Sequence, residues 1–306
     1  HTPYLFLIPF LRKYMRNVKL EGKIQPFKHF KECMVYFVPT IAIQIYTILD
    51  KTMIGLITNS DFENGYYEQA EKIVKLPLTV ITTMNIIMRS RISYYFSNKE
   101  FDKIKVLTRK STCFSLMLSI PIMLGSIAIA KKFVPFYLGS GYDECILLIY
   151  ILAPLILIIS LSNLLGTHYY TPYNLQRTSN KFLIIGAIVN VILNIPLIYF
   201  FKSKGAAIAS VSAELIITVL YIIFAKKFFT FKELFLCGYK YCIGGVIMFG
   251  ATFTLDYYLP NTIWYLLLEI SCGIGIYFLV LLLIKDQFLL TNIKKLWHDI
   301  TSFRRK

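Results

Sequence analysis

The chain has 306 residues, of which 56% are hydrophobic and only 16% are charged, against about 25% charged residues in a typical soluble domain. The net charge of +16 would suit a nucleic-acid-binding protein, but the Lys and Arg residues gather in alternate polar segments, as they do when a membrane protein keeps positive charge in the cytoplasm. With a mean hydropathy of +0.59, the composition indicates an all-α integral membrane protein and excludes a soluble nucleic-acid-binding domain.

The chain opens on an incomplete apolar segment. Residues 2–11, TPYLFLIPFL, have the composition of a membrane span but about half its length, and no cleavable signal pattern accompanies them. We therefore expect 1–32 to be the end of a truncated span plus a basic cytoplasmic linker, and the whole chain to be a fragment of a longer protein.

Eight further apolar stretches each approach or exceed about 20 residues, the length that a helix needs to cross a bilayer. The predicted spans are 33–57, 66–96, 110–130, 145–170, 182–201, 205–225, 241–259 and 262–284. The pattern therefore predicts a polytopic helical protein.

The polar segments between these spans alternate between basic and nearly neutral. One set carries 24 Lys and Arg residues and the other carries four. The basic set is 12–32, 97–110, 171–181, 226–240 and 285–306, and the opposite set is 58–65, 131–144, 202–204 and 256–261. Because positive charge is retained on the cytoplasmic side, this imbalance predicts that both ends of the chain are cytoplasmic.

Ionisable side chains lie inside the first two spans, where a charge at the helix centre costs roughly 2.5 to 3.5 kcal/mol. Asp50 and Lys51 lie about seven residues below the outer end of the first span. The second span carries four charged residues on one helical face, with each Glu four residues before a Lys. These are Glu68, Glu71, Lys72 and Lys75.

Two interpretations of this face stay open. Its ion pairs neutralise each other near the outer interface, or the face is the wall of a water-filled cavity, which lipid could not replace. As a hypothesis, Asp50 pairs with Lys72 or Lys75 and leaves excess positive charge to meet an anionic ligand.

Other polar residues lie in later spans. Glu214 stands alone near the middle of 205–225, where a carboxyl group is protonated, hydrogen-bonded or open to a cavity. Glu269 poses the same question in the last span. Asn190 and Asn194 are one helical turn apart and predict hydrogen bonds between helices.

Residue types that bind metals or catalyse reactions occur without the spacing that such sites require. The six cysteines form no CxxC pair and are predicted to be small apolar residues within helices. His29, His168 and His298 are predicted to lie near surfaces without partners at metal-ligand spacing. No DxD, HExxH, GxSxG or phosphate-binding glycine loop is present, so we predict no enzyme activity, no metal and no cofactor.

The segment 285–306 combines an apolar stripe at steps of three and four residues with basic side chains. It predicts an amphipathic helix on the inner membrane surface, in preference to a partner-binding helix.

A series of strings resembles, in order and spacing, the C-terminal half of Wzx-type bacterial polysaccharide-biosynthesis flippases. The strings are FVPTIAIQIYTILDKTMIG, GYYEQAEKIVKLPLTVITT, IPIMLGSIAIAKKFVPFYLGSGY, LSNLLGTHYYTPYN, GAIVNVILNIPLIYF and KGAAIASVSAELI. The resemblance extends over about residues 20–285. One departure is MRSRIS, where Arg89 and Ser90 replace the apolar residue and proline of the family pattern while Arg91 remains.

The resemblance implies a fold of the MATE-like superfamily, which has two six-helix bundles around a central cavity and often two further helices. It assigns 33–228 to the second six-helix bundle and 229–284 to two additional transmembrane helices. Residues 1–32 would then lead from a missing N-terminal lobe, and 285–306 would be a cytoplasmic tail. Sites at the interface of two repeats and alternating access by rocking suit such a fold.

The resemblance also implies a flippase that moves undecaprenyl-pyrophosphate-linked oligosaccharide units across the bacterial inner membrane for capsule, O-antigen or exopolysaccharide assembly. Its partners would be membrane lipid, that glycan lipid and the missing lobe. The implied roles are anion attraction by Lys51, Lys72 and Lys75, positioning of those lysines by Asp50, Glu68 and Glu71, glycan hydrogen bonds from Gln44 and Gln69, and ion or proton coupling by Glu214. The alternatives are a MATE-type cation-coupled drug antiporter and a non-transporting half-transporter fragment.

Overall fold

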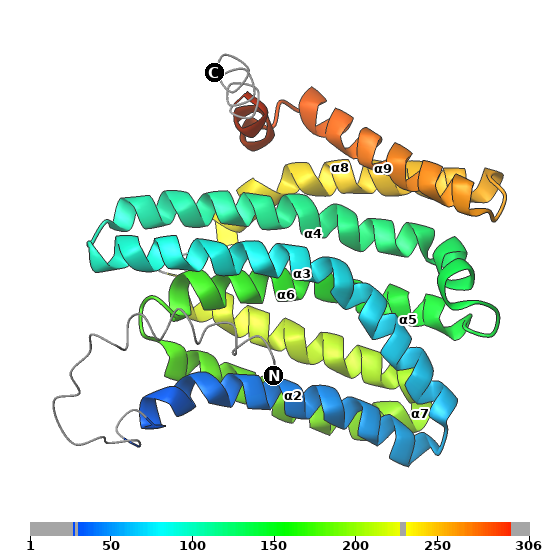
Figure 1. The fold of residues 1–306 in the computed structure, drawn as a ribbon, viewed down its shortest axis with the longest axis horizontal. Coiled ribbons are helices and arrows are strands. Elements are labelled where there is room, and N and C mark those ends of the chain that lie inside the picture. The colour runs from blue at the N-terminus through cyan, green and yellow to red at the C-terminus, as the bar shows by residue number, and fades with distance from the viewer. Residues whose placement is uncertain (1–26, 28–29, 227–230, 295–306) are drawn as a thin grey trace, which may run out of the picture.

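The computed structural model describes residues 27, 30–226 and 231–294, and within these ranges the ordered elements are all helices (Figure 1). They are α2 (Phe30–Thr58), α3 (Asp61–Ser97), α4 (Phe101–Leu138), α5 (Glu144–Leu152), α6 (Pro154–Leu165), the π-helix η2 (Gly166–Tyr170), α7 (Gln176–Phe224), α8 (Phe231–Tyr258) and α9 (Ile263–Leu283). The all-α architecture predicted from the composition is therefore confirmed.

Five helical stretches within the described residues are long and apolar enough to cross a membrane. They are α4, the rod Glu144–Tyr170 formed by α5, α6 and η2, α7, Lys232–Tyr258 of α8, and α9. They contain six of the eight predicted spans, because α7 holds two. The first two predicted spans are present as α2 and α3, with 29 and 37 residues, and their passage through the membrane stays a prediction.

The helix α7 is two antiparallel arms joined by one tight reversal. Lys202 breaks the helical geometry with φ 54° and ψ −132°. Gly205 packs directly against the chain that enters the turn, since a Cβ at this position would lie 2.0 Å from the carbonyl oxygen of Leu197. Gly186 of the first arm faces Ile217 of the second arm. The predicted break at 202–204 is confirmed.

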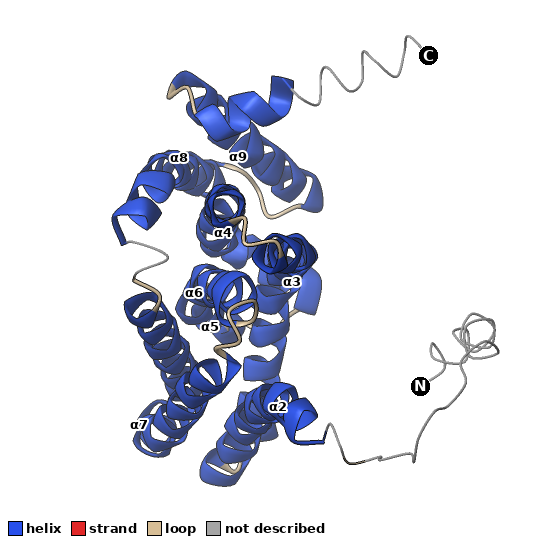
Figure 2. Ribbon diagram, turned by 90° about the vertical axis from the view of Figure 1, so that its left-hand side faces the viewer, coloured by secondary structure: helices blue, strands red, loops and turns tan. Residues whose placement is uncertain are grey.

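The helices lie side by side with their long axes roughly aligned. Figures 1 and 2 show α8 and α9 on one flank, α2 and α7 on the other, and α3, α5 and α6 between α4 and the α2–α7 flank. A run of buried alanines on the second arm of α7 lets its backbone approach its neighbours closely, which is how helices associate where lipid removes the hydrophobic driving force. These are Ala206, Ala207, Ala209 and Ala213.

The predicted outer segments meet at one end of the molecule. The Ser203 hydroxyl donates to Glu63 at 2.6 Å, and Lys204 Nζ lies 2.7 Å from Glu144 Oε2. At the same end, Lys132 Nζ lies 3.3 Å from Asp256 Oδ1. Contacts thus join all four of the segments that carry few cations, as the alternation of charge predicts. The side of the membrane that this end faces stays a prediction.

The helix α4 continues past the predicted boundary. The span was predicted to end at residue 130, but α4 runs to Leu138 and buries Lys132 within the helix bundle. Consecutive lysines mark where the apolar sequence ends, and helical hydrogen bonds continue beyond that point. The assignment of Lys132 to an outer loop was therefore wrong.

The last two helices pack along α4. Tyr277 of α9 donates its hydroxyl to the carbonyl of Met117 on α4 at 2.8 Å. Residues 287–294 form a further short helix. Its Leu289 is buried, and the backbone NH of Leu289 donates to the Asp286 carboxylate at 2.9 Å. The predicted tail helix beyond residue 294 lies outside the described residues, as do the truncated span and most of the linker in 1–32.

Candidate functional site

The helices α2 and α3 form a hairpin that brings their charged residues level with one another. Only Asn59 and Ser60 connect them, a shorter link than the predicted eight residues. Asn59 reverses the chain with φ 50°, and the Ser60 hydroxyl accepts the backbone NH of Glu63 at the start of α3. Because a helix rises about 1.5 Å per residue and the link is short, Asp50 and Lys51 lie beside the first three turns of α3.

Five charged side chains on this hairpin form one connected network, which we call the α2–α3 charge network. Lys51 Nζ lies 3.4 Å from Glu71 and 3.9 Å from Glu68. Lys72 lies 2.8 Å from Glu68, and Lys75 donates to Glu71 at 2.6 Å. Three lysines and two glutamates leave a net charge of +1. Glu68 and Glu71 thus form ion pairs with these lysines, and their role in positioning the lysines for a ligand stays a prediction.

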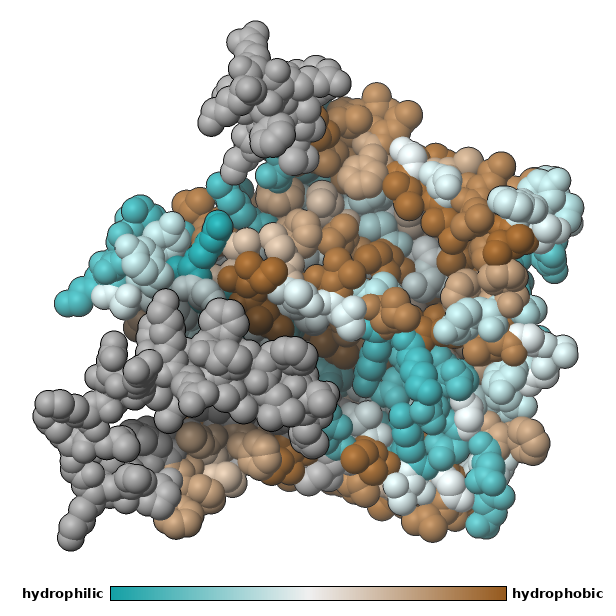
Figure 3. Space-filling model, in the orientation of Figure 1, coloured by the Kyte–Doolittle hydropathy of each residue, from teal (hydrophilic) through white to brown (hydrophobic). Residues whose placement is uncertain are grey.

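The network lies open on one face of the molecule. The side chain of Lys72 is 59% exposed and that of its partner Glu68 is 40% exposed, while Glu71, which pairs with Lys51 and Lys75, is only 9% exposed. Figure 3 shows a hydrophilic band here, over the parts of α2 and α3 at the lower right, between largely apolar surfaces. The buried Glu71 and the partly exposed Glu68 thus hold lysines whose side chains stay partly exposed, an arrangement that can offer positive charge to an anion.

Asp50 belongs to a different set of contacts. It is 2% exposed and accepts hydrogen bonds from Asn194 at 2.5 Å, from Ser210 at 2.7 Å and from Tyr67 at 3.2 Å. The predicted pairing of Asp50 with Lys72 or Lys75 is therefore wrong. The side chain points away from the network, toward α7.

The polar group around Asp50 spans three helices, and we call it the Asp50 cluster. It contains Asp50 on α2, Tyr67 on α3, and Asn190, Asn194 and Ser210 on α7. Within the described residues its contacts are neutral donors, and no Lys or Arg touches the carboxylate. The Oδ1 atom of Asn194 is buried without a hydrogen-bond partner. A carboxyl group in such surroundings is most stable when a proton or a small cation balances its charge.

The remaining predicted site residues are on α2, α3 and α7. Gln44 is exposed on α2 and Gln69 is half-buried on α3. Glu214 is half-buried on the second arm of α7, where its backbone carbonyl accepts the Thr218 hydroxyl at 2.9 Å. Their predicted roles in glycan binding and ion coupling stay predictions.

A second charged group lies buried at the outer end of α4, and we call it the buried triad. Lys132 donates to Glu269 of α9 and lies 3.3 Å from Asp256 of α8. The side chains of Lys132 and Glu269 are 4% and 0% exposed. The sequence left open whether Glu269 is protonated or faces a cavity, and the structure shows it ion-paired between helices.

The prediction that His168 lies near a surface is wrong. It is fully buried in η2, and its Nε2 atom lies 3.4 Å from the backbone carbonyl of Asn85. The Asn85 amide in turn bonds to Asn163 and accepts Ser115. This contact joins η2 to α3. Among the described residues no three His, Cys, Asp or Glu side chains gather in a way that could hold a metal.

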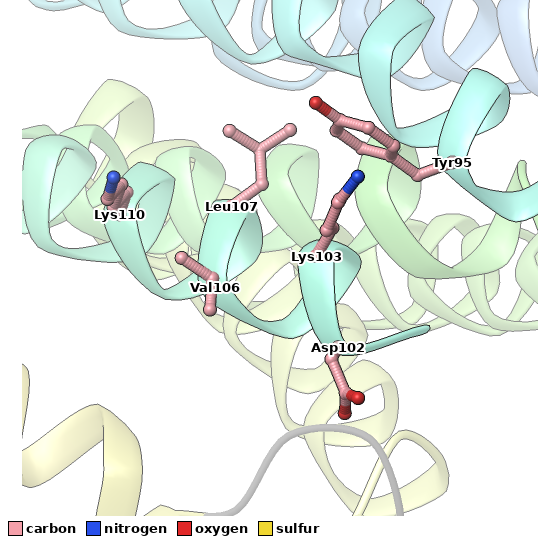
Figure 4. Close-up of a pocket in the computed structure, with 6 residues that line it drawn as sticks. All are labelled: Tyr95, Asp102, Lys103, Val106, Leu107 and Lys110. Carbon is pink, nitrogen blue, oxygen red and sulfur yellow. The ribbon is translucent and has the colours of Figure 1, made fainter. Parts of the chain in front are cut away.

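A shallow groove of about 320 Å³ lies at the opposite end, where α3 meets α4 (Figure 4). It is lined by Tyr95, Asp102, Lys103, Val106, Leu107 and Lys110. Lys103 pairs with Glu100 and lies 5.5 Å from the centre of the Tyr95 ring. Since this segment is one of the basic ones predicted to be cytoplasmic, its cations are explained by topology without a ligand.

Comparison with known proteins relates this chain to polysaccharide biosynthesis. Residues 6–147 match a family model described as "Polysaccharide biosynthesis protein". The chain is 29% identical over 197 residues to "Putative O-antigen transporter" of Escherichia coli, which covers 62% of this chain and 46% of the relative. It is 23% identical over 217 residues to "Probable low-salt glycan biosynthesis flippase Agl15" of Haloferax volcanii, an alignment that covers 70% of this chain and 46% of the relative. The chain thus spans about half the length of these curated relatives.

A solved structure supports the fold. The lipid II flippase MurJ in its inward closed conformation superposes with a TM-score of 0.70 at 18% identity, over 92% of this chain and 60% of that one. At this identity the match establishes a MurJ-like helical fold and leaves substrate and site residues to be argued from the chain itself.

Proposed function

Since this chain belongs to the polysaccharide-biosynthesis and O-antigen flippase family, we propose that it forms the C-terminal part of a flippase for undecaprenyl-pyrophosphate-linked oligosaccharides. The site would lie on the face of α2 and α3, at the boundary with an N-terminal lobe supplied by the rest of the protein. The membrane would be the bacterial inner membrane, with both ends of this chain in the cytoplasm.

The α2–α3 charge network is the observation that carries the proposal. A lipid-linked pyrophosphate is anionic, and the sugars that follow it are polar, so the carrier needs an accessible positive group within a wet cavity. Lys51, Lys72 and Lys75 meet that need, because Glu68 and Glu71 fix them without cancelling their charge. A ligand phosphate could take the place of Glu68 on the exposed Lys72.

The Asp50 cluster suits a coupling role in the same transporter. Asp50 joins α2 to both arms of α7, through Asn194 on the first arm and Ser210 on the second. Loading or release of a proton or alkali cation at this carboxylate would change the contacts between these helices. Asp50 is therefore a candidate coupling residue beside Glu214, and it does not contact the substrate directly.

A complementation experiment tests the proposal. The gene that encodes this chain is deleted in its native host, and lipid-linked oligosaccharide is measured in each leaflet. We expect accumulation on the cytoplasmic side, rescue by the wild-type gene, and poor rescue by Lys72→Ala. Matched expression of Lys131→Ala, an exposed lysine outside the network, is the control. Normal glycan lipids in a host without a second flippase would overturn the proposal and would favour the drug antiporter.

A further inference from the structure

Two cysteines that the sequence separates meet at the interface between α4 and α8. Cys113 lies on α4, and Cys237, 124 residues later, lies near the start of α8. Their sulfur atoms are 2.8 Å apart, with the Cys113 thiol directed at the Cys237 sulfur. Disulfide sulfurs lie about 2.0 Å apart, so roughly 0.8 Å of closure would bring these two into bonding distance. Both thiols are free in this structure.

The surroundings of this pair favour reaction. Arg109 lies one helical turn before Cys113, and its positive charge acts on the Cys237 sulfur. A guanidinium beside a sulfur stabilises the thiolate, which is the form that reacts. Cys237 is buried with 8% of its surface exposed, but its partner Cys113 is only half-buried and Arg109 is exposed, so a small oxidant can enter beside Cys113.

We propose that Cys113 and Cys237 are a redox-sensitive thiol pair that a peroxide converts into a disulfide, tying α8 covalently to α4. The Cys237 thiolate attacks one peroxide oxygen, which breaks the O–O bond and gives a sulfenic acid and, after protonation, water. The Cys113 thiol then attacks that sulfur, forms the S–S bond and releases a second water. In total, two thiols are oxidised and one hydrogen peroxide is reduced to two waters.

The location makes this an inducible bond. Both cysteines lie near helix ends that are predicted to be cytoplasmic, where thiols are normally kept reduced. Oxidative stress would therefore form the bond and the cellular reductants would remove it. The bond would fix the α8–α9 pair on the six-helix bundle, and this inference is independent of what the protein transports.

Peptide mapping of the whole purified chain tests the pair without any substitution. The protein is treated with hydrogen peroxide, its remaining thiols are alkylated, and its peptides are analysed by mass spectrometry before and after reduction. We expect the number of alkylated cysteines to fall from six to four, with one linked peptide joining Cys113 to Cys237 and full recovery on reduction.

Two variants separate this pair from general oxidation. Cys113→Ser should abolish the linked peptide, whereas Cys242→Ser, which removes an exposed thiol on the same helix α8, should leave it unchanged. The oxidised wild type should also unfold at a higher temperature than the reduced protein, because a cross-link restricts the unfolded chain. The proposal is overturned if Cys113 and Cys237 stay alkylatable while the exposed cysteines oxidise, or if the cysteines link at random.

Discussion

The α2–α3 charge network and the buried triad are built from the same residue types but differ in exposure and in the helices that they join. Lys72 is 59% exposed and meets a glutamate of its own helix, whereas Lys132 is 4% exposed and meets acids from two other helices. An exposed pair is worth about 0 to 1 kcal/mol and exchanges partners readily. A buried pair that loses one member leaves an uncompensated charge, so its geometry is fixed.

The difference distinguishes the proposed binding site from a contact that holds helices together. The network keeps a net positive charge on an exposed face, and its most exposed lysine, Lys72, can exchange partners. The triad joins α4, α8 and α9 at one end, with two carboxylates for one ammonium group. We therefore expect substitutions in the network to alter transport more than stability, and substitutions in the triad to do the reverse.

Replacement of Lys132 by Ala should have the largest effect on stability. The fully buried Glu269 and the 14% exposed Asp256 would lose their cation, and we expect a loss of about 3 to 5 kcal/mol in the free energy of unfolding. Equilibrium unfolding in detergent measures it. The neighbouring Lys131→Ala, on an exposed position, should change stability by no more than about 0.5 kcal/mol. Equal effects of the two variants would show that the triad does not hold the helices together.

Removal of all three charges of the triad should reverse most of that loss. In the variant Lys132→Met, Asp256→Asn, Glu269→Leu no ion is left unpaired, and replacing a buried ion network by apolar groups is often neutral or stabilising by about 1 to 4 kcal/mol. The same unfolding experiment compares it with Lys132→Ala. If the triple variant is less stable than the single variant, the three groups contribute more to the free energy of unfolding than the neutralisation of one another's charges.

Replacement of Lys72 by Ala should change stability by less than about 1 kcal/mol, because its pair with Glu68 is largely exposed. Unfolding of this variant beside Lys132→Ala gives the sharpest contrast between the two regions. A loss comparable to that of Lys132→Ala would mean that the network is structural and would remove the basis for its role in binding.

The smallest effect should come from a carboxylate at the outer end. Burial alone would raise the pKa of Glu63, but hydrogen bonds from Ser203 and the nearby Lys202 outweigh it and hold the pKa below its usual value of 4.5. The pKa is then lower in the folded than in the unfolded chain, so the stabilisation is complete above pH 4.5 and is lost as the pH falls through the folded value. Glu63→Gln should weaken this acid dependence of the unfolding temperature, while Asp61→Asn, on an exposed neighbour, should leave it unchanged.

Much of the fold could be predicted because each membrane helix has a local signal in the sequence. Runs of about 20 apolar residues gave the predicted spans, and the alternation of Lys and Arg grouped the outer segments that the structure joins. The residues at which helices end were harder to predict. Lys131 and Lys132 look alike in the sequence, and only packing decides that one is exposed and the other buried.

The partners of the site residues could be predicted only where they were local. The pairs within α3 follow from a spacing of four residues, and Lys72 with Glu68 is such a pair. Two of the three hydrogen-bond donors to Asp50 are 144 and 160 positions away, and Lys132 contacts Glu269 over 137 positions. No local pattern reports such distances, so the sequence favoured the nearer lysines as partners of Asp50.

A series of network variants tests most directly whether the α2–α3 charge network recognises an anion. The network has a net charge of +1 in the wild type, +2 in Glu68→Gln, 0 in Lys72→Ala and −1 in Lys72→Glu. Lipid-linked oligosaccharide that reaches the outer leaflet is measured for each variant in the deletion host. We expect it to fall with the charge, with a loss of about 10- to 150-fold for Lys72→Ala and a larger loss for Lys72→Glu, as expected when about 1.5 to 3 kcal/mol of charged contact is removed. Wild-type transport by Lys72→Glu, or an equal loss in Glu68→Gln and Lys72→Ala, would contradict anion recognition by this network.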